Sequence, residues 1–177
     1  RLYAAPAVAF LAALAALEGP LWRSASLLSV SVVVLTLSIF EHRHFRRTEE
    51  LALGIPANLA ALLIGQAIVI TGTGGLVSPL MPGVVLFGMV GGLFGPRPFI
   101  RWMPVLFHLP WLAALTWLHV HAPPEDFIPS YLEGWMVLGR GKGPWIVAGV
   151  FGLFVLGAPR VGRRVRKVIT RAYEDLS

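Results

Sequence analysis

A short glycine-rich segment carries the residues best suited to hold a ligand. Gly74 and Gly75 are followed by Ser78 and Pro79, and the segment joins two apolar stretches. Glycine permits tight turns with exposed backbone N–H groups, and a Ser-Pro pair can cap and open a helix. The free N–H donors at such a helix start can hold the carbonyl oxygen of a membrane-soluble ligand such as a quinone. A simple connection between two helices is the plainer interpretation.

Histidines and one tryptophan form the second group of candidates. His108 lies inside an apolar stretch, with Trp111 one helical turn away. An ionisable residue within a membrane span is a functional candidate, although a bond to a nearby carbonyl would also satisfy the ring. His119 and His121 end the same stretch, where they can sense protons or form a polar cap. Because side chains two residues apart on a helix point in different directions, we predict no metal site.

No recognised catalytic motif occurs in the chain. It has no glycine-rich loop followed by Lys-Ser/Thr, no His-Glu-x-x-His and no nucleophile elbow, and it contains no cysteine. The apolar stretches also lack Asp, Glu, Lys and Arg, which proton-coupled transporters and intramembrane enzymes usually need. We therefore predict no catalytic residue in this chain.

The composition indicates that these residues lie in a membrane. Hydrophobic residues make up 56% of the 177 residues and charged residues 14%, whereas soluble domains carry about 25% charged residues. A helix needs about 20 apolar residues to cross a bilayer core. The candidate spans are 2–17, 24–40, 51–70, 77–94, 102–121 and 144–158. We predict an all-α integral membrane protein, a bundle of six transmembrane helices over residues 1–159 with a cytoplasmic C-terminal helix.

The positive charges predict which way the helices cross. Lys and Arg concentrate on the cytoplasmic side of membrane proteins. With the N-terminus inside, twelve of the 15 Lys and Arg fall in cytoplasmic segments and only Arg23, Arg140 and Lys142 fall outside. We therefore expect both termini in the cytoplasm and the protein in the cell inner (plasma) membrane. The same charges argue against a nucleic-acid partner, because they lie between apolar stretches rather than on one polar face.

The last residues differ from the spans before them. Residues 160–177 are basic, and apolar residues recur in them every three or four positions. This stripe consists of Val161, Val165, Val168, Ala172 and Leu176. It predicts a helix that continues the last span through Pro159 and relays a signal, either by pairing as a homodimeric coiled coil or by lying on anionic lipid headgroups. Gly88 and Gly92, in the fourth span, have the spacing that allows close helix packing.

The glycine-rich segment resembles a motif of a known family. Gly74-Gly75-Leu76-Val77-Ser78-Pro79-Leu80 is similar to the Gly-Gly-x-x-Asn-Pro-Phe segment of the Reg/Prr-type redox-sensing histidine kinases. Both glycines and Pro79 match, while Ser78 replaces the family's Asn and Leu80 its Phe. The resemblance implies a six-helix sensor domain followed by a dimerisation helix and a kinase core. It also implies a quinone as the molecule that the turn senses.

These observations lead to one interpretation and two alternatives. We expect the membrane-embedded sensory input domain of a bacterial sensor histidine kinase in a two-component system, a homodimer whose output domain follows in the same chain. A passive membrane anchor for a cyclase or another cytoplasmic enzyme is one alternative, and a small transporter or membrane enzyme is the other. Because the chain begins with Arg1 and stops after a basic helix-like segment, we expect it to be a piece of a longer protein.

Overall fold

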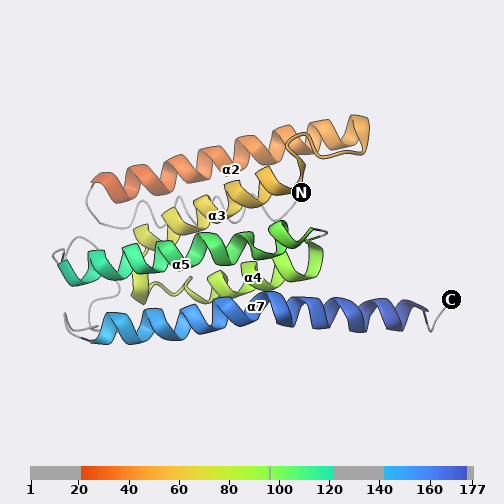
Figure 1. The fold of residues 1–177 in the computed structure, drawn as a ribbon. Coiled ribbons are helices and arrows are strands. Elements are labelled where there is room, and N and C mark those ends of the chain that lie inside the picture. The colour runs from red at the N-terminus through yellow and green to blue at the C-terminus, as the bar shows by residue number, and fades with distance from the viewer. Residues whose placement is uncertain (1–20, 96, 122–141, 175–177) are drawn as a thin grey trace. The chain divides into compact units, whose positions relative to one another are not determined.

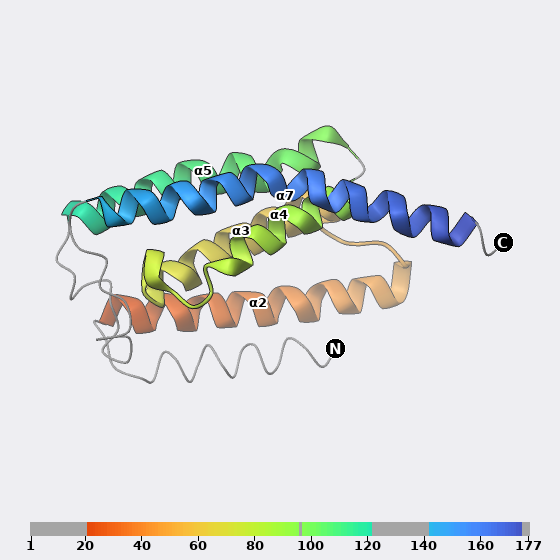
Figure 2. The same ribbon diagram turned by 90° about the horizontal axis from the view of Figure 1, so that it is seen from below.

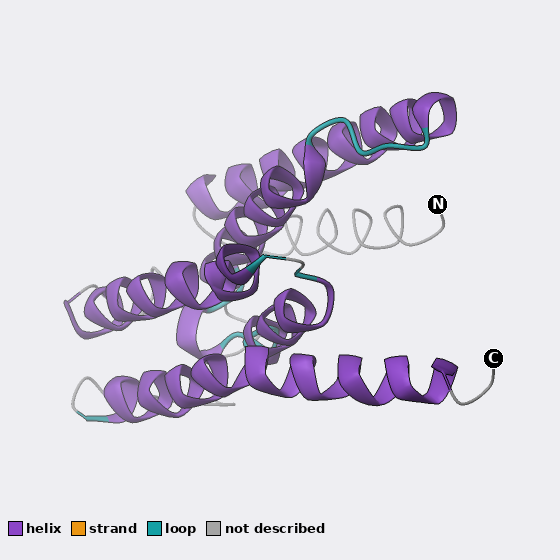
Figure 3. Ribbon diagram, turned by 45° about the vertical axis from the view of Figure 1, so that its right-hand side comes forward, coloured by secondary structure: helices purple, strands orange, loops and turns teal. Residues whose placement is uncertain are grey.

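A computed structural model describes residues 21–95, 97–121 and 142–174. Over these residues the secondary structure is entirely helical and contains no strand (Figure 3). The elements in chain order are α2 (Leu21–Thr48), α3 (Gly54–Gly72), the 3-10 helix η1 (Gly75–Val77), α4 (Pro82–Phe94), α5 (Pro98–His121) and α7 (Gly143–Glu174) (Figure 1).

Four of the described helices are long and apolar enough to cross a membrane, namely α2, α3, α5 and α7. They contain most of the predicted spans 24–40, 51–70, 102–121 and 144–158, so the prediction of apolar helices is confirmed there. Two of them continue well past the apolar stretch. α2 has 28 residues and ends on Arg46 and Arg47, whose charges favour the negative end of the helix dipole. α7 has 32 residues.

The fourth predicted span, residues 77–94, is α-helical over only part of its length. α4 has only 13 residues, about 20 Å of helix, which is less than the roughly 30 Å of a bilayer core. Pro82 stands in its first turn, where the N–H that proline lacks would have no acceptor within the helix. The residues before it form η1 and turns instead. The first predicted span, 2–17, lies outside the described residues, and the count of six stays a prediction.

Residues 21–78 form the described part of one compact unit. In it α2 and α3 run antiparallel, as Figures 1 and 2 show. Near the end of α2, the Glu41 carboxylate accepts bonds from the Ala52 and Leu53 N–H groups, both at 2.9 Å, and from the Asn58 amide at 2.8 Å. Glu41 thereby fixes the residues just before α3, and Asn58 within it, to the end of α2.

Residues 79–121 and 142–174 make up the described part of a second unit. α4 and α7 run parallel, because Gly88 approaches Ala158 and Gly92 approaches Pro159. α5 runs antiparallel to α4, since Gly91 meets Pro104 and Gly95 meets Arg101. In Figures 1 and 2 the second half of α7 extends beyond both α4 and α5.

The contact between α4 and α7 brings the two backbones together. A Cβ built on Gly88 would lie 2.8 Å from the Ala158 Cβ, and one built on Gly92 would collide with the Pro159 carbonyl oxygen. On α7, a Cβ on Gly162 would collide with the Met89 carbonyl oxygen. Gly88 and Gly92 therefore meet a second pair of small residues at the same spacing, Ala158 and Gly162. We call this contact the α4–α7 seam. It is the close approach that the glycine spacing predicts.

Candidate functional site

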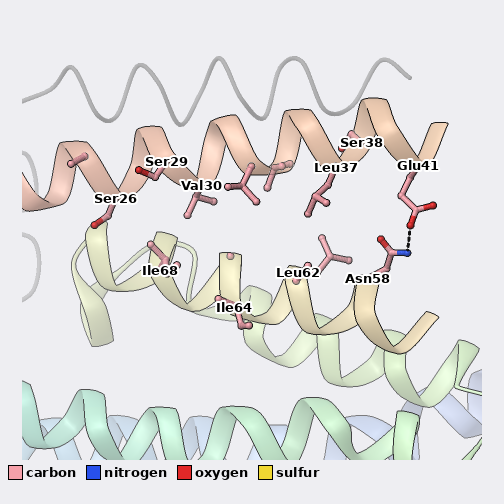
Figure 4. Close-up of a pocket in the computed structure, with 15 residues that line it drawn as sticks. Ser26, Ser29, Val30, Leu37, Ser38, Glu41, Asn58, Leu62, Ile64 and Ile68 are labelled. Atoms are coloured by element: carbon pink, nitrogen blue, oxygen red, sulfur yellow. Dashed lines mark hydrogen bonds between the residues drawn. The ribbon is translucent and has the colours of Figure 1, made fainter. Parts of the chain in front are cut away.

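A groove of about 760 Å³ lies between α2 and α3. Figure 4 shows its aliphatic walls, which include Val30, Leu37 and Ile64, and the Glu41–Asn58 bond at one end. Ser26 also lines it, but its hydroxyl donates to the Trp22 carbonyl oxygen of the preceding turn at 2.7 Å. The lining of the groove is therefore largely apolar. Such a groove suits a hydrocarbon chain or a second apolar helix.

The glycine-rich turn is compact and buried. Gly74 and Gly75 have φ values of 118° and 58°, a left-handed conformation that favours glycine. The Thr73 and Ser78 hydroxyls lie 2.6 Å apart, and both side chains are buried. The Ser78 N–H donates to the Gly75 carbonyl oxygen at 3.1 Å. The turn thus places two buried hydroxyl groups beside a backbone that two glycines hold in the left-handed conformation.

The predicted helix start at this turn is wrong. Ser78 follows η1 and does not cap α4, which begins at Pro82. The backbone N–H groups of Val77 and Ser78 bond to the carbonyl oxygens of Gly74 and Gly75, each at 3.1 Å. They are therefore used within the turn itself. The groups that this turn can offer a ligand are hydroxyls rather than free helix N–H donors.

The candidate residues of α5 lie in the second unit. His108 is fully buried, and its ring lies edge-on to Trp111 with 6.0 Å between the ring centroids. His119 is partly buried and lies in the last turn of α5. The structure therefore joins Thr73 to Ser78 in one unit and His108 to Trp111 in the other. A single ligand site shared by the two pairs stays a prediction.

The relay residues lie on one uninterrupted helix. α7 continues through Pro159 to Glu174, so the basic segment extends the last apolar span as predicted. Val161, Val165 and Val168 are all exposed, Val168 to 67%. Ala172 is exposed too, and Leu176 lies outside the described residues. Within the described residues the apolar stripe is thus left uncovered, while Gly162 on the same helix is buried against α4.

Two polar features were missed from the sequence. Arg23, which the predicted span bounds placed in an outer loop, lies within α2 and is 4% exposed, with its aliphatic part near Gly72 of α3. Glu41 and Asn58 join the two helices across 17 positions of sequence. The one available signal was that Glu41 directly follows one apolar stretch and Asn58 lies in the first half of the next. Hydropathy alone does not pair such residues.

The described part of the chain therefore has the makeup of an all-helical membrane protein, with four helices of membrane-spanning length and hydropathy. No protein-family model matches the chain, and neither a curated protein nor a solved structure matches it.

Proposed function

We propose that this chain is the sensory input domain of a signal-transducing membrane protein of the sensor histidine kinase class. The observation that carries the proposal is α7, which runs as one helix from the α4–α7 seam into an exposed basic segment. A change in the seam would move the whole exposed half, because a continuous helix transmits rotation and translation without losing its own backbone bonds. The resemblance of the Gly74–Leu80 segment to redox-sensing kinases supports the same class.

The turn between α3 and α4 is the proposed ligand site. Its Ser78 hydroxyl can both donate and accept a hydrogen bond, as contact with a quinone carbonyl or hydroxyl requires. The left-handed Gly74 and Gly75 hold the turn in a shape that other residues rarely adopt. A bound ligand would act at the root of α4, and α4 packs directly against α7. Ligand and relay helix are thereby connected through a single element.

Six spans with both termini in the cytoplasm are the proposed topology. The antiparallel α2–α3 pair and the alternating directions of α4, α5 and α7 support it, because successive spans must reverse direction. α4 is short, and the crossing would be completed by η1 and its flanking turns. Irregular backbone is tolerated at membrane depth when protein covers it, and Gly75, Leu76 and Val77 are buried.

Reporter fusions test this topology. A reporter that is active only in the cytoplasm should be active when it is fused after Glu50 or Arg101. The same reporter should be inactive when it is fused after Thr73, which we expect on the outer side. The physical reason is that Arg43, Arg46, Arg47, Arg97 and Arg101 resist translocation. A cytoplasmic signal at Thr73 would contradict the topology, since α3 would then not cross the membrane.

The exposed stripe of α7 is the proposed homodimer contact. Because the chain has no native cysteine, single cysteines can be introduced into it and cross-linked in membranes. We expect Val165→Cys and Val168→Cys to give disulfide-linked dimers readily, and Arg166→Cys on another side of the helix to give several-fold less. Equal yields at all three positions would contradict a defined dimer seam. No dimer at any position would leave the stripe facing lipid and defeat the paired relay.

A further inference from the structure

Arginines from two segments of the second unit gather where α5 begins and α7 leaves the α4–α7 seam. They are Arg97, Arg101, Arg160, Arg163 and Arg164, and we call them the basic collar. The Arg160 guanidinium carbon lies 5.9 Å from the centre of the Trp102 ring, which brings the middle of α7 to the first turn of α5. Arg97 and Arg101 precede Trp102 in the sequence by five residues and one residue. At a helical rise of about 1.5 Å per residue, both therefore lie within about 8 Å of it along the helix axis.

The collar has almost no negative charge near it in its own unit. The described residues of this unit hold nine Lys and Arg and a single acidic residue, Glu174, at the far end of α7. The first turn of α5 contains no acidic residue. Arg97 and Arg101 therefore add positive charge to the positive end of a helix dipole, an arrangement that favours a bound anion.

The collar also has the composition that is typical of the lipid headgroup region. Trp and Arg together mark the boundary between hydrocarbon and water in membrane proteins. Before the collar, α7 is apolar over residues 144–158. From the collar onward, the helix is exposed and charged. Arg160, Arg163, Arg164, Lys167 and Arg171 recur at spacings that place them on one side of the helix. A basic row of this kind beside a membrane span attracts anionic headgroups.

We propose that the basic collar binds the phosphate groups of anionic phospholipids and so holds the root of α7 at the membrane surface. Arg163 and Arg164 are exposed and carry most of this contact, while Arg160 is steadied against Trp102. The inference does not depend on the chain being a sensor, because an anchor would use the same surface. In a sensor, the lipid would bias the position from which α7 moves.

The test measures lipid preference directly. The full-length protein is reconstituted in phosphatidylcholine vesicles with a trace of spin-labelled phosphatidylglycerol or spin-labelled phosphatidylcholine, and the fraction of each label immobilised by protein is compared. We expect preference for phosphatidylglycerol, lowered at least about fivefold in Arg163→Gln/Arg164→Gln at low ionic strength. Arg163→Lys/Arg164→Lys should keep most of the preference, because it keeps the charge. A circular dichroism spectrum confirms that each variant remains helical.

Arg46→Gln/Arg47→Gln is the matched control. It also removes two exposed charges, but these lie at the negative end of the α2 dipole and precede Glu49 and Glu50. It should change the preference much less. Equal loss in both double variants, or no preference in the native protein, would overturn the proposal. Suppression by inorganic phosphate at matched ionic strength would indicate a free-anion site instead, and displacement by RNA a nucleic-acid surface; either result would also overturn it.

Discussion

Replacing Gly162 by alanine should destabilise the protein, although alanine normally favours a helix. The added Cβ would collide with the Met89 carbonyl oxygen and lie 2.9 Å from the Leu93 nitrogen and 3.1 Å from the Gly92 carbonyl carbon. All three are backbone atoms and cannot rotate away, so α4 and α7 must separate. Overpacking of this kind costs about 1–3 kcal/mol, and Gly162→Leu should cost more because its longer side chain meets the same backbone.

Gly157→Ala provides the matched control on the same helix. A Cβ built on Gly157 meets nothing within 4 Å, so this change should bring only the helix-propensity gain of about 0.5–1 kcal/mol. The measurement is the unfolding midpoint of the purified protein in mild detergent titrated with a denaturing detergent. The two substitutions are expected to shift the midpoint in opposite directions. A higher midpoint for both would show that the seam is looser than these distances indicate.

The sequence predicted the seam only in part. The spacing of Gly88 and Gly92 indicated a close helix contact because small residues permit backbone approach. This spacing did not identify the partner helix. Ala158 and Gly162 have the same spacing, but Pro159 lies between them and arginines follow. Which two helices meet depends on tertiary packing, and no local pattern in either helix carries that information.

Hydropathy predicted α2, α3, α5 and α7 because their apolar runs are long and free of charge. For α4 it overestimated the length of the helix, since a run of apolar residues does not distinguish a helix from a buried turn. Pro79 and Pro82 both lack an N–H, and only the structure shows that the helix starts at Pro82. The exposed end of α7 was predicted from its periodic stripe, because a regular three-four spacing is a local property of a helix.

The sequence predicted the glycine-rich turn better than it predicted the hydrogen bonds of that turn. Gly74 and Gly75 do form the expected tight turn, and both adopt the left-handed conformation. Ser78 was expected to cap a helix, but its hydroxyl pairs with that of Thr73 instead. The difference arises because the backbone between Gly74 and Ser78 closes on itself in a 3-10 turn, which removes the free N–H groups that a helix start would have offered.

An insertion series in α7 tests the relay most directly, and it should produce the largest change in output. In the full-length protein, one residue inserted after Lys167 rotates everything that follows by about 100° relative to the seam. The exposed stripe would then be out of register above and below the insertion, with Val161 and Val165 on one side and Val168 and Ala172 on another. Seven residues restore the alignment to within about 20°.

The measurement is the signal-dependent output activity of the full-length protein in membranes, compared for insertions of zero, one and seven residues at this point. The relay predicts that one residue locks or inverts the output, so that the response to the signal is lost, and that seven residues largely restore it. A passive anchor has no reason to depend on helical phase. An output that is the same for all three lengths would contradict the relay and leave α7 as a membrane attachment alone.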